Sequence, residues 1–162
     1  MPRSAVPRSA VPPRIFVPEH AELAIRYACV EVFPRESFGW LVGLYPAENT
    51  WHVQAAVPTQ IVSGRSRWHV EAHDDSERAQ DLVIDDHTIG DFHSHPNGEG
   101  CAPSHHDRED MLSTEPDGKC FLIAAIHPSR KHPAGFHIKL GGYVVLNGRI
   151  RRATIARPQT SI

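Results

Sequence analysis

Apolar residues recur along this chain with two periods, one typical of helices and one typical of strands. A helix is predicted at about 18–33, because apolar residues are spaced three and four apart and Pro18 suits a first helical position. Segments 74–86 and 104–113 also predict helices. Short apolar runs predict strands at 15–17, 38–45, 51–58, 67–72, 88–95, 119–127, 136–146 and 149–156.

The order of these elements predicts one mixed α+β domain. Asn147-Gly148 separates the last two runs and is a strong signal for a two-residue hairpin. No internal repeat is visible within residues 15–157, so we expect a single curved sheet with a few helices on it there. A Pro/Arg-rich segment at 1–14 predicts a disordered tail, with docking to a partner as the alternative, and 158–162 predicts a second short tail.

Length and charge exclude several classes of protein. The 162 residues suffice for one domain but not for an eight-stranded α/β barrel, which needs about 250. The net charge of −2 gives no electrostatic indication of nucleic-acid binding. No apolar run approaches the ~20 residues of a membrane span. Three cysteines without a CxxC pair and no readable signal peptide favour a cytoplasmic location.

Histidine is the exception in this composition, with 12 copies, and its placement indicates a metal site. His93 and His95 lie two apart on a predicted strand, so both imidazoles share one face. Asp107 follows in the first turn of the next predicted helix, where it can face back toward them. Two histidines and one carboxylate are a three-ligand zinc set that leaves a fourth position for water, as catalytic zinc sites do.

Each part of this pattern also has a simpler explanation. A single His-x-His pair arises easily by chance in a histidine-rich chain, and Ser104-x-x-Asp107 resembles a helix N-cap. The combined spacing is harder to obtain by chance. Among other metallohydrolases, zinc deaminases need His-x-Glu and Pro-Cys-x-x-Cys, which do not occur in this sequence, and a nuclease would require a basic groove.

The combined motif resembles that of the JAMM/MPN-plus metalloproteases. Their signature, His-Ser/Thr-His-Pro, about seven residues and Ser-x-x-Asp, fits residues 93–107 without a gap. Their upstream Glu-x-x-Gly-x-Leu-x-Gly element fits Glu36 to Gly43. The resemblance spans about 15–156 and implies an MPN-type curved, mostly antiparallel sheet flanked by helices, with cytidine-deaminase-like layering.

The resemblance also implies a role for each matched position. His93, His95 and Asp107 match the ligands of one zinc ion. Glu36 matches the general base; without the family, Glu31 and Glu71 are equal candidates. Ser104 matches the residue that helps to hold the oxyanion. The implied reaction is zinc-dependent hydrolysis of an amide or isopeptide bond.

The implied partner is a ubiquitin-like β-grasp protein or its conjugates, together with E1- or E2-like enzymes of a conjugation system. The short segment between Asp107 and Lys119 indicates a minimal, prokaryotic-type member. Two alternatives stay open. One is release of an amino acid from the C-terminus of a sulfur-carrier protein, and the other is a non-catalytic MPN binding scaffold.

Two further residues near the motif are weaker candidates. Cys101 lies in the loop between the ligands, where a thiol can bind zinc or sense oxidation, but an ordinary loop cysteine is the favoured explanation because the family's ligand set is already complete. Asp91 precedes the ligand strand and is a candidate for a partner that orients a ligand.

Overall fold

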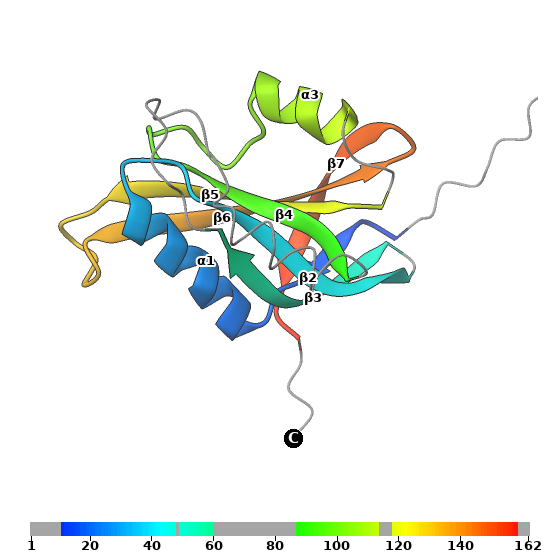
Figure 1. Ribbon diagram of the computed structural model, residues 1–162, viewed down its shortest axis with the longest axis horizontal. Helices are drawn as coiled ribbons and strands as arrows, with labels where there is room; N and C mark the ends of the chain where they lie inside the picture. Colours follow the sequence, from blue (N-terminus) through cyan, green and yellow to red (C-terminus); the bar gives the residue numbers. More distant parts are fainter. Residues whose placement is uncertain (1–10, 48, 60–86, 114–117, 159–162) are drawn as a thin grey trace, which may run out of the picture.

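A computed structural model describes residues 11–47, 49–59, 87–113 and 118–158 of the chain (Figure 1). Within them lie seven strands and two helices. The predicted strand at 67–72 and helix at 74–86 fall outside the described residues. In chain order the elements are β1 (Arg14–Phe16), α1 (Glu19–Val32), β2 (Phe38–Ala47), β3 (Thr50–Pro58), β4 (Thr88–His95), α3 (His105–Ser113), β5 (Cys120–Pro128), β6 (Phe136–Leu146) and β7 (Arg149–Ala156).

The strands form one sheet that closes on itself in the order β1-β3-β2-β4-β5-β6-β7. The sequence predicted a curved sheet, and the structure shows in addition that this sheet closes into a barrel. Closure depends on β1, which pairs in parallel with β3 on one side and with β7 on the other. The sheet is mostly antiparallel, as expected, because four of its seven pairings are antiparallel. Three residues of β1 carry too little periodicity to reveal these distant pairings.

The β6–β7 hairpin is confirmed at the predicted position. Asn147 and Gly148 have φ angles of 52° and 66°, the left-handed values that a two-residue turn between twisted strands requires. Asparagine and glycine adopt these angles at low cost. The turn chemistry therefore fixes the register in which Leu146 pairs with Arg149.

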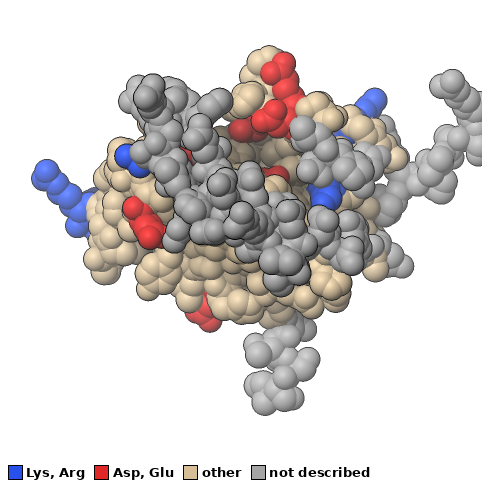
Figure 2. All heavy atoms as spheres, in the orientation of Figure 1, with Lys and Arg blue, Asp and Glu red and all other residues tan. Residues whose placement is uncertain are grey.

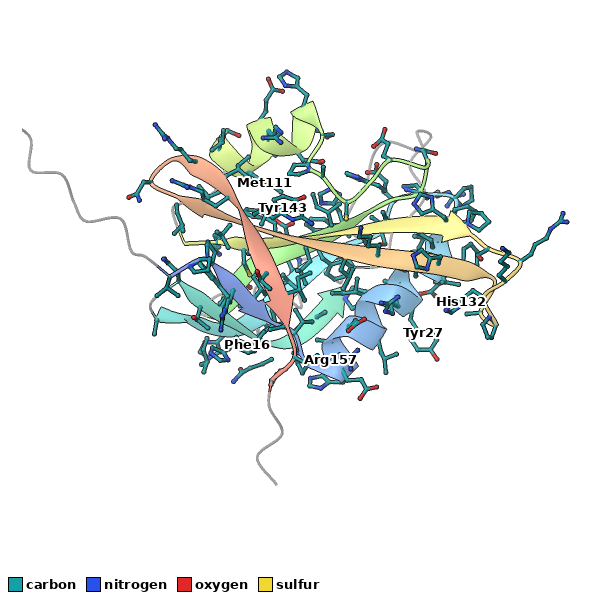
Figure 3. The ribbon with its side chains drawn as sticks, turned by 180° about the vertical axis from the view of Figure 1, so that it is seen from behind. Phe16, Tyr27, Met111, His132, Tyr143 and Arg157 are labelled. Carbon is teal, nitrogen blue, oxygen red and sulfur yellow. The ribbon has the colours of Figure 1, made fainter. Side chains whose placement is uncertain are left out.

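Apolar residues fill the two sides of the sheet separately. The larger cluster lies on the α1 side and includes the completely buried Ile25, Cys29 and Trp51. The smaller cluster lies under α3, where Met111 points from the helix toward Tyr143 of β6 (Figure 3). Neither of the helices in the described ranges is long and apolar enough to cross a membrane. The helices and the sheet thus form a layered domain with α1 and α3 on opposite faces (Figure 1).

Close packing at Gly39 brings β2 tightly against its two neighbours. A Cβ atom at this buried position would collide with the ring of Phe92 on β4 and with the carbonyl oxygen of Val57 on β3. Overpacking of this kind costs about 1–3 kcal/mol. We expect Gly39→Ala to lower the free energy of unfolding by at least that amount in chemical denaturation, because the carbonyl belongs to the main chain and cannot swing aside.

The matched control for this substitution is Gly100→Ala. Gly100 is exposed, and an added Cβ would meet no atom within 4 Å. Its free energy of unfolding should change by no more than about 0.5 kcal/mol. Equal stability of the two variants would contradict the packing argument.

Candidate metal centre

Strand β4 presents His93 and His95 on the face of the sheet that α3 covers. Residues two apart on a strand point the same way, and the intervening Ser94 points to the α1 side, where it is completely buried. The two imidazole Nε2 atoms lie 3.1 Å apart. The His95 side chain is 3% exposed and that of His93 15%, so one ligand is held in the protein while the other borders the solvent.

The start of α3 brings Asp107 to the same point. Ser104 precedes the helix, and its hydroxyl accepts a hydrogen bond of 3.1 Å from the main-chain N–H of Asp107. In return, the main-chain N–H of Ser104 donates a 2.6 Å hydrogen bond to Asp107 Oδ2. This reciprocal pair is a capping box with aspartate in the third helical position. It fixes the carboxylate in an orientation that faces β4.

Three side chains converge as a result. His93 Nε2 is 3.2 Å from Asp107 Oδ1, and His95 Nε2 is 3.2 Å from Asp107 Oδ2. One ligand atom from each residue lies within 4.8 Å of the others, and no further His, Cys, Asp or Glu of the described ranges joins this group. The sequence analysis expected these three residues to meet, and the structure places them together with the geometry of a single-ion site.

The charges of this group are strongly coupled. Burial alone would raise the pKa of the Asp107 carboxyl, but hydrogen bonds to His93 and His95 outweigh it and hold that pKa well below its usual range. Burial likewise would lower the pKa of His95, yet the hydrogen bond to Asp107 and that to the carbonyl of Gly100 raise it overall. The carboxylate is thus ionised at neutral pH, which is the state that a metal ligand requires.

The orientation of His95 is set by a main-chain contact. His95 Nδ1 donates to the carbonyl oxygen of Gly100 at 2.9 Å, which assigns the proton to Nδ1 and directs the Nε2 lone pair at the shared point. Sequence reasoning missed Gly100, because a carbonyl acceptor leaves no signal in residue type. Glu99, whose carboxylate is 3.9 Å from the same nitrogen, was also missed; its spacing of four from His95 is the signal that was available.

Glu36 reaches the group through the register of β2 and β4. Phe38 pairs with His93 in this antiparallel ladder, so continuing the register by two residues sets Glu36 beside His95 on the same face. Burial raises the pKa of Glu36 above its ordinary value, and the nearby His93 and His95 offset part of that rise. The carboxyl is therefore close enough to sense both histidines and is not one of the three converging ligands.

The remaining candidates lie farther from the centre. Cys101 packs on the α3-side cluster, where its sulfur would be 3.2 Å from a Cβ added at Gly141, and it is not one of the converging groups. Asp91 pairs with Trp40 two residues before His93, and its charge adds to burial, the larger cause, in raising the pKa of Cys120. Its part in orienting a ligand stays a prediction.

Comparisons with known proteins agree with this fold. Two solution structures resemble the chain. A Desulfitobacterium hafniense protein has 19% identity, a TM-score of 0.63, and coverage of 89% of this chain and 92% of its own. A Salinibacter ruber protein has 21% identity, a TM-score of 0.61, and coverage of 92% and 93%. A search of curated proteins gives no significant match.

The fold and the His-His-Asp group together define a domain of the JAB/MPN class. The family model of prokaryotic homologs of the JAB domain matches residues 18–138. The chain belongs to this family, which confirms the resemblance inferred from the sequence motif.

Proposed function

We propose that this protein is a zinc-dependent hydrolase of amide or isopeptide bonds. The observation that supports it most directly is the convergence of His93, His95 and Asp107 on one point, with Glu36 on the same face. Ligand atoms about 2.0–2.1 Å from a tetrahedral zinc ion stand roughly 3.3–3.4 Å from one another. The two imidazole nitrogens lie 3.1 Å apart, and each lies 3.2 Å from its nearer Asp107 oxygen, which is close to that spacing for each pair. With a single ligand atom from each residue, the three atoms lie within 4.8 Å of one another.

The donor set also suits zinc chemically. Two imidazole nitrogens and one carboxylate oxygen are ligands that zinc accepts, and three protein ligands leave a fourth position open. When bound, zinc would supply a water molecule with a pKa near 7 and would polarise a carbonyl group. Asp107 is already ionised, so its carboxylate can bind a metal without first releasing a proton.

Two residues of the chain would carry out the proton transfers and charge stabilisation. Glu36 would accept a proton from the attacking water and deliver it to the leaving amine, a task that its burial-raised pKa favours. The hydroxyl of Ser104 accepts a hydrogen bond from Asp107 N–H and has its own hydrogen to donate toward a developing oxyanion. These are the roles that the family resemblance assigns to the same positions.

The proposed substrate is the C-terminal tail of a ubiquitin-like β-grasp protein joined to an amine, within a pathway that uses E1- or E2-like enzymes. The surroundings suit a cationic leaving group such as a lysine amine, because Glu36, Glu99 and Asp107 gather at the centre. Acidic side chains also line α3 above a hollow in this face (Figure 2). Phe38 and Trp40 pack edge to face beside His93, with 5.0 Å between ring centroids, and would supply an apolar wall for an extended tail.

Cleavage followed by intact-mass analysis tests this function. Zinc-loaded protein is mixed with ubiquitin-like and sulfur-carrier proteins that carry C-terminal peptide or isopeptide extensions. We expect loss of the extension mass for at least one of them, and no loss after the zinc is chelated. The identity of the cleaved partner separates modifier removal from release of an amino acid from a carrier. Stoichiometric zinc with no cleavage of any partner would contradict the hydrolase and favour a binding scaffold.

A further inference from the structure

Three buried side chains on the α1 side lie directly behind the metal centre, and the chemistry proposed above does not use them. They are Cys29 of α1, Ser37 just before β2 and Ser94 of β4, with exposures of 0%, 1% and 0%. Cys29 Sγ is 3.3 Å from Ser37 Oγ. Ser37 follows Glu36 in the chain, and Ser94 lies between the two histidine ligands. This arrangement connects the segment that carries the general base to the strand that carries the metal ligands.

The connection consists of two hydrogen bonds, which we call the serine clasp. The main-chain N–H of Ser94 donates to the carbonyl of Ser37 at 3.0 Å, as in an ordinary antiparallel ladder. The reciprocal bond differs, because the N–H of Ser37 donates to the hydroxyl oxygen of Ser94 at 2.8 Å rather than to a carbonyl. A side chain thus completes the ladder one residue before β2 begins at Phe38.

We propose that Ser94 is a positioning residue that sets the place of Glu36 relative to the metal ligands. The inference rests on the proposed function, since Glu36 matters in this way only if it moves the proton. Glu36 is half-buried, and Ser37 is its direct neighbour in the chain. Without the hydroxyl of Ser94, the N–H of Ser37 loses its acceptor. The segment that leads into β2 is then joined to Ser94 by one hydrogen bond instead of two. A displacement of about 1 Å in a catalytic group can cost roughly 100-fold in rate.

Ser94→Thr and Ser94→Val form the sharpest pair of variants, because they have the same shape and differ only in the hydroxyl. With a cleaved β-grasp substrate, we expect kcat of the valine variant to be about 10- to 100-fold below that of the threonine variant. KM and bound zinc should be equal in the two, since the ligands and the substrate surface are unchanged. Ser94→Ala should resemble the valine variant. It replaces that variant in the comparison, against the wild type, if the larger side chains prevent folding.

Thr59→Val is the matched control. Thr59 is also buried, and its hydroxyl donates a 3.0 Å hydrogen bond to the carbonyl of Phe38, the residue after Ser37. Thr59 itself is not part of the ligand strand β4. This variant should retain the wild-type kcat even if its stability falls. Equal losses of kcat in Thr59→Val and Ser94→Val would show a merely structural role and overturn the proposal. So would unchanged kcat in Ser94→Val, or a loss of zinc from it.

Amide hydrogen exchange, measured by NMR without substrate, separates this proposal from the proposed function. The N–H of Ser37 should exchange at least about tenfold faster in Ser94→Val than in Ser94→Thr. Unchanged protection would overturn the clasp whether or not any substrate is cleaved. If the Ser37 N–H loses protection in Ser94→Val but the protein cleaves no β-grasp partner, the serine clasp is supported and only the proposed hydrolase function is contradicted.

Discussion

His95→Ala is expected to abolish both zinc binding and hydrolysis. His95 is the most buried of the three ligands, and its ring is held in place by the carbonyl of Gly100. Removal of a residue that merely orients a zinc ligand costs about 10- to 100-fold in affinity, and removal of the ligand itself costs more. We expect an affinity loss of at least about 100-fold in competition titration, together with activity at background.

His106→Ala is the matched control for this variant. His106 lies 11 residues farther along the chain on α3, its side chain is 77% exposed, and its ring lies 3.4 Å from Asp110 on the same helix. It should bind zinc and cleave substrate as the wild type does. A fully active, zinc-free His95→Ala protein would rule out the metal centre.

Glu36→Gln is expected to keep zinc and to lose turnover. Glutamine preserves the size of the side chain but cannot accept a proton, so binding of the metal by His93, His95 and Asp107 is unaffected. General acid–base catalysis contributes about 10²- to 10⁴-fold, and a fall in kcat of that size is expected with little change in KM. Zinc content by mass spectrometry accompanies the kinetic measurement.

Glu31→Gln provides the comparison, because Glu31 was an equal candidate on residue type and lies exposed near the end of α1. It should leave kcat unchanged. The pH profile gives a further test of the base. Glu36 works when deprotonated and burial raises its pKa, so activity should rise with pH through a value above the ordinary ~4.3 of glutamate. Near wild-type activity of Glu36→Gln would show that another group is the base.

The parts of the fold that are determined locally were predictable from the sequence. The periodicity of α1, the alternation along β4 and the Asn147-Gly148 turn each act within a few residues, and the structure has them where the pattern puts them. Closure of the sheet was not predictable in this way. It depends on pairings of β1 with strands near residues 50 and 154, and a three-residue strand gives no local sign of its partners.

The candidate centre also combines residues whose positions are set locally with residues whose positions depend on distant pairings. His93, His95 and Asp107 were found because strand and helix spacing alone bring them together. Glu36 was chosen over Glu31 only through the family motif, since its proximity arises from the register between β2 and β4. Gly100 acts through its main-chain carbonyl, for which residue type carries no information. The serine clasp depends on which main-chain N–H meets the hydroxyl of Ser94, and that is decided by the pairing of distant segments.

The position of β1 in the sheet also affects how the protein can be made. Arg14 pairs with Thr154, so β1 finds one of its neighbours only after nearly all of the described chain has been synthesised. Contacts between such distant segments form slowly, because a long loop must be closed before they stabilise anything. Until then the edge of β1 that faces β7 and the edge of β6 lack their partner strand, and uncovered edges are sites of aggregation. Closure of the sheet therefore waits for β7, and the nascent chain is most vulnerable in the interval before β7 arrives.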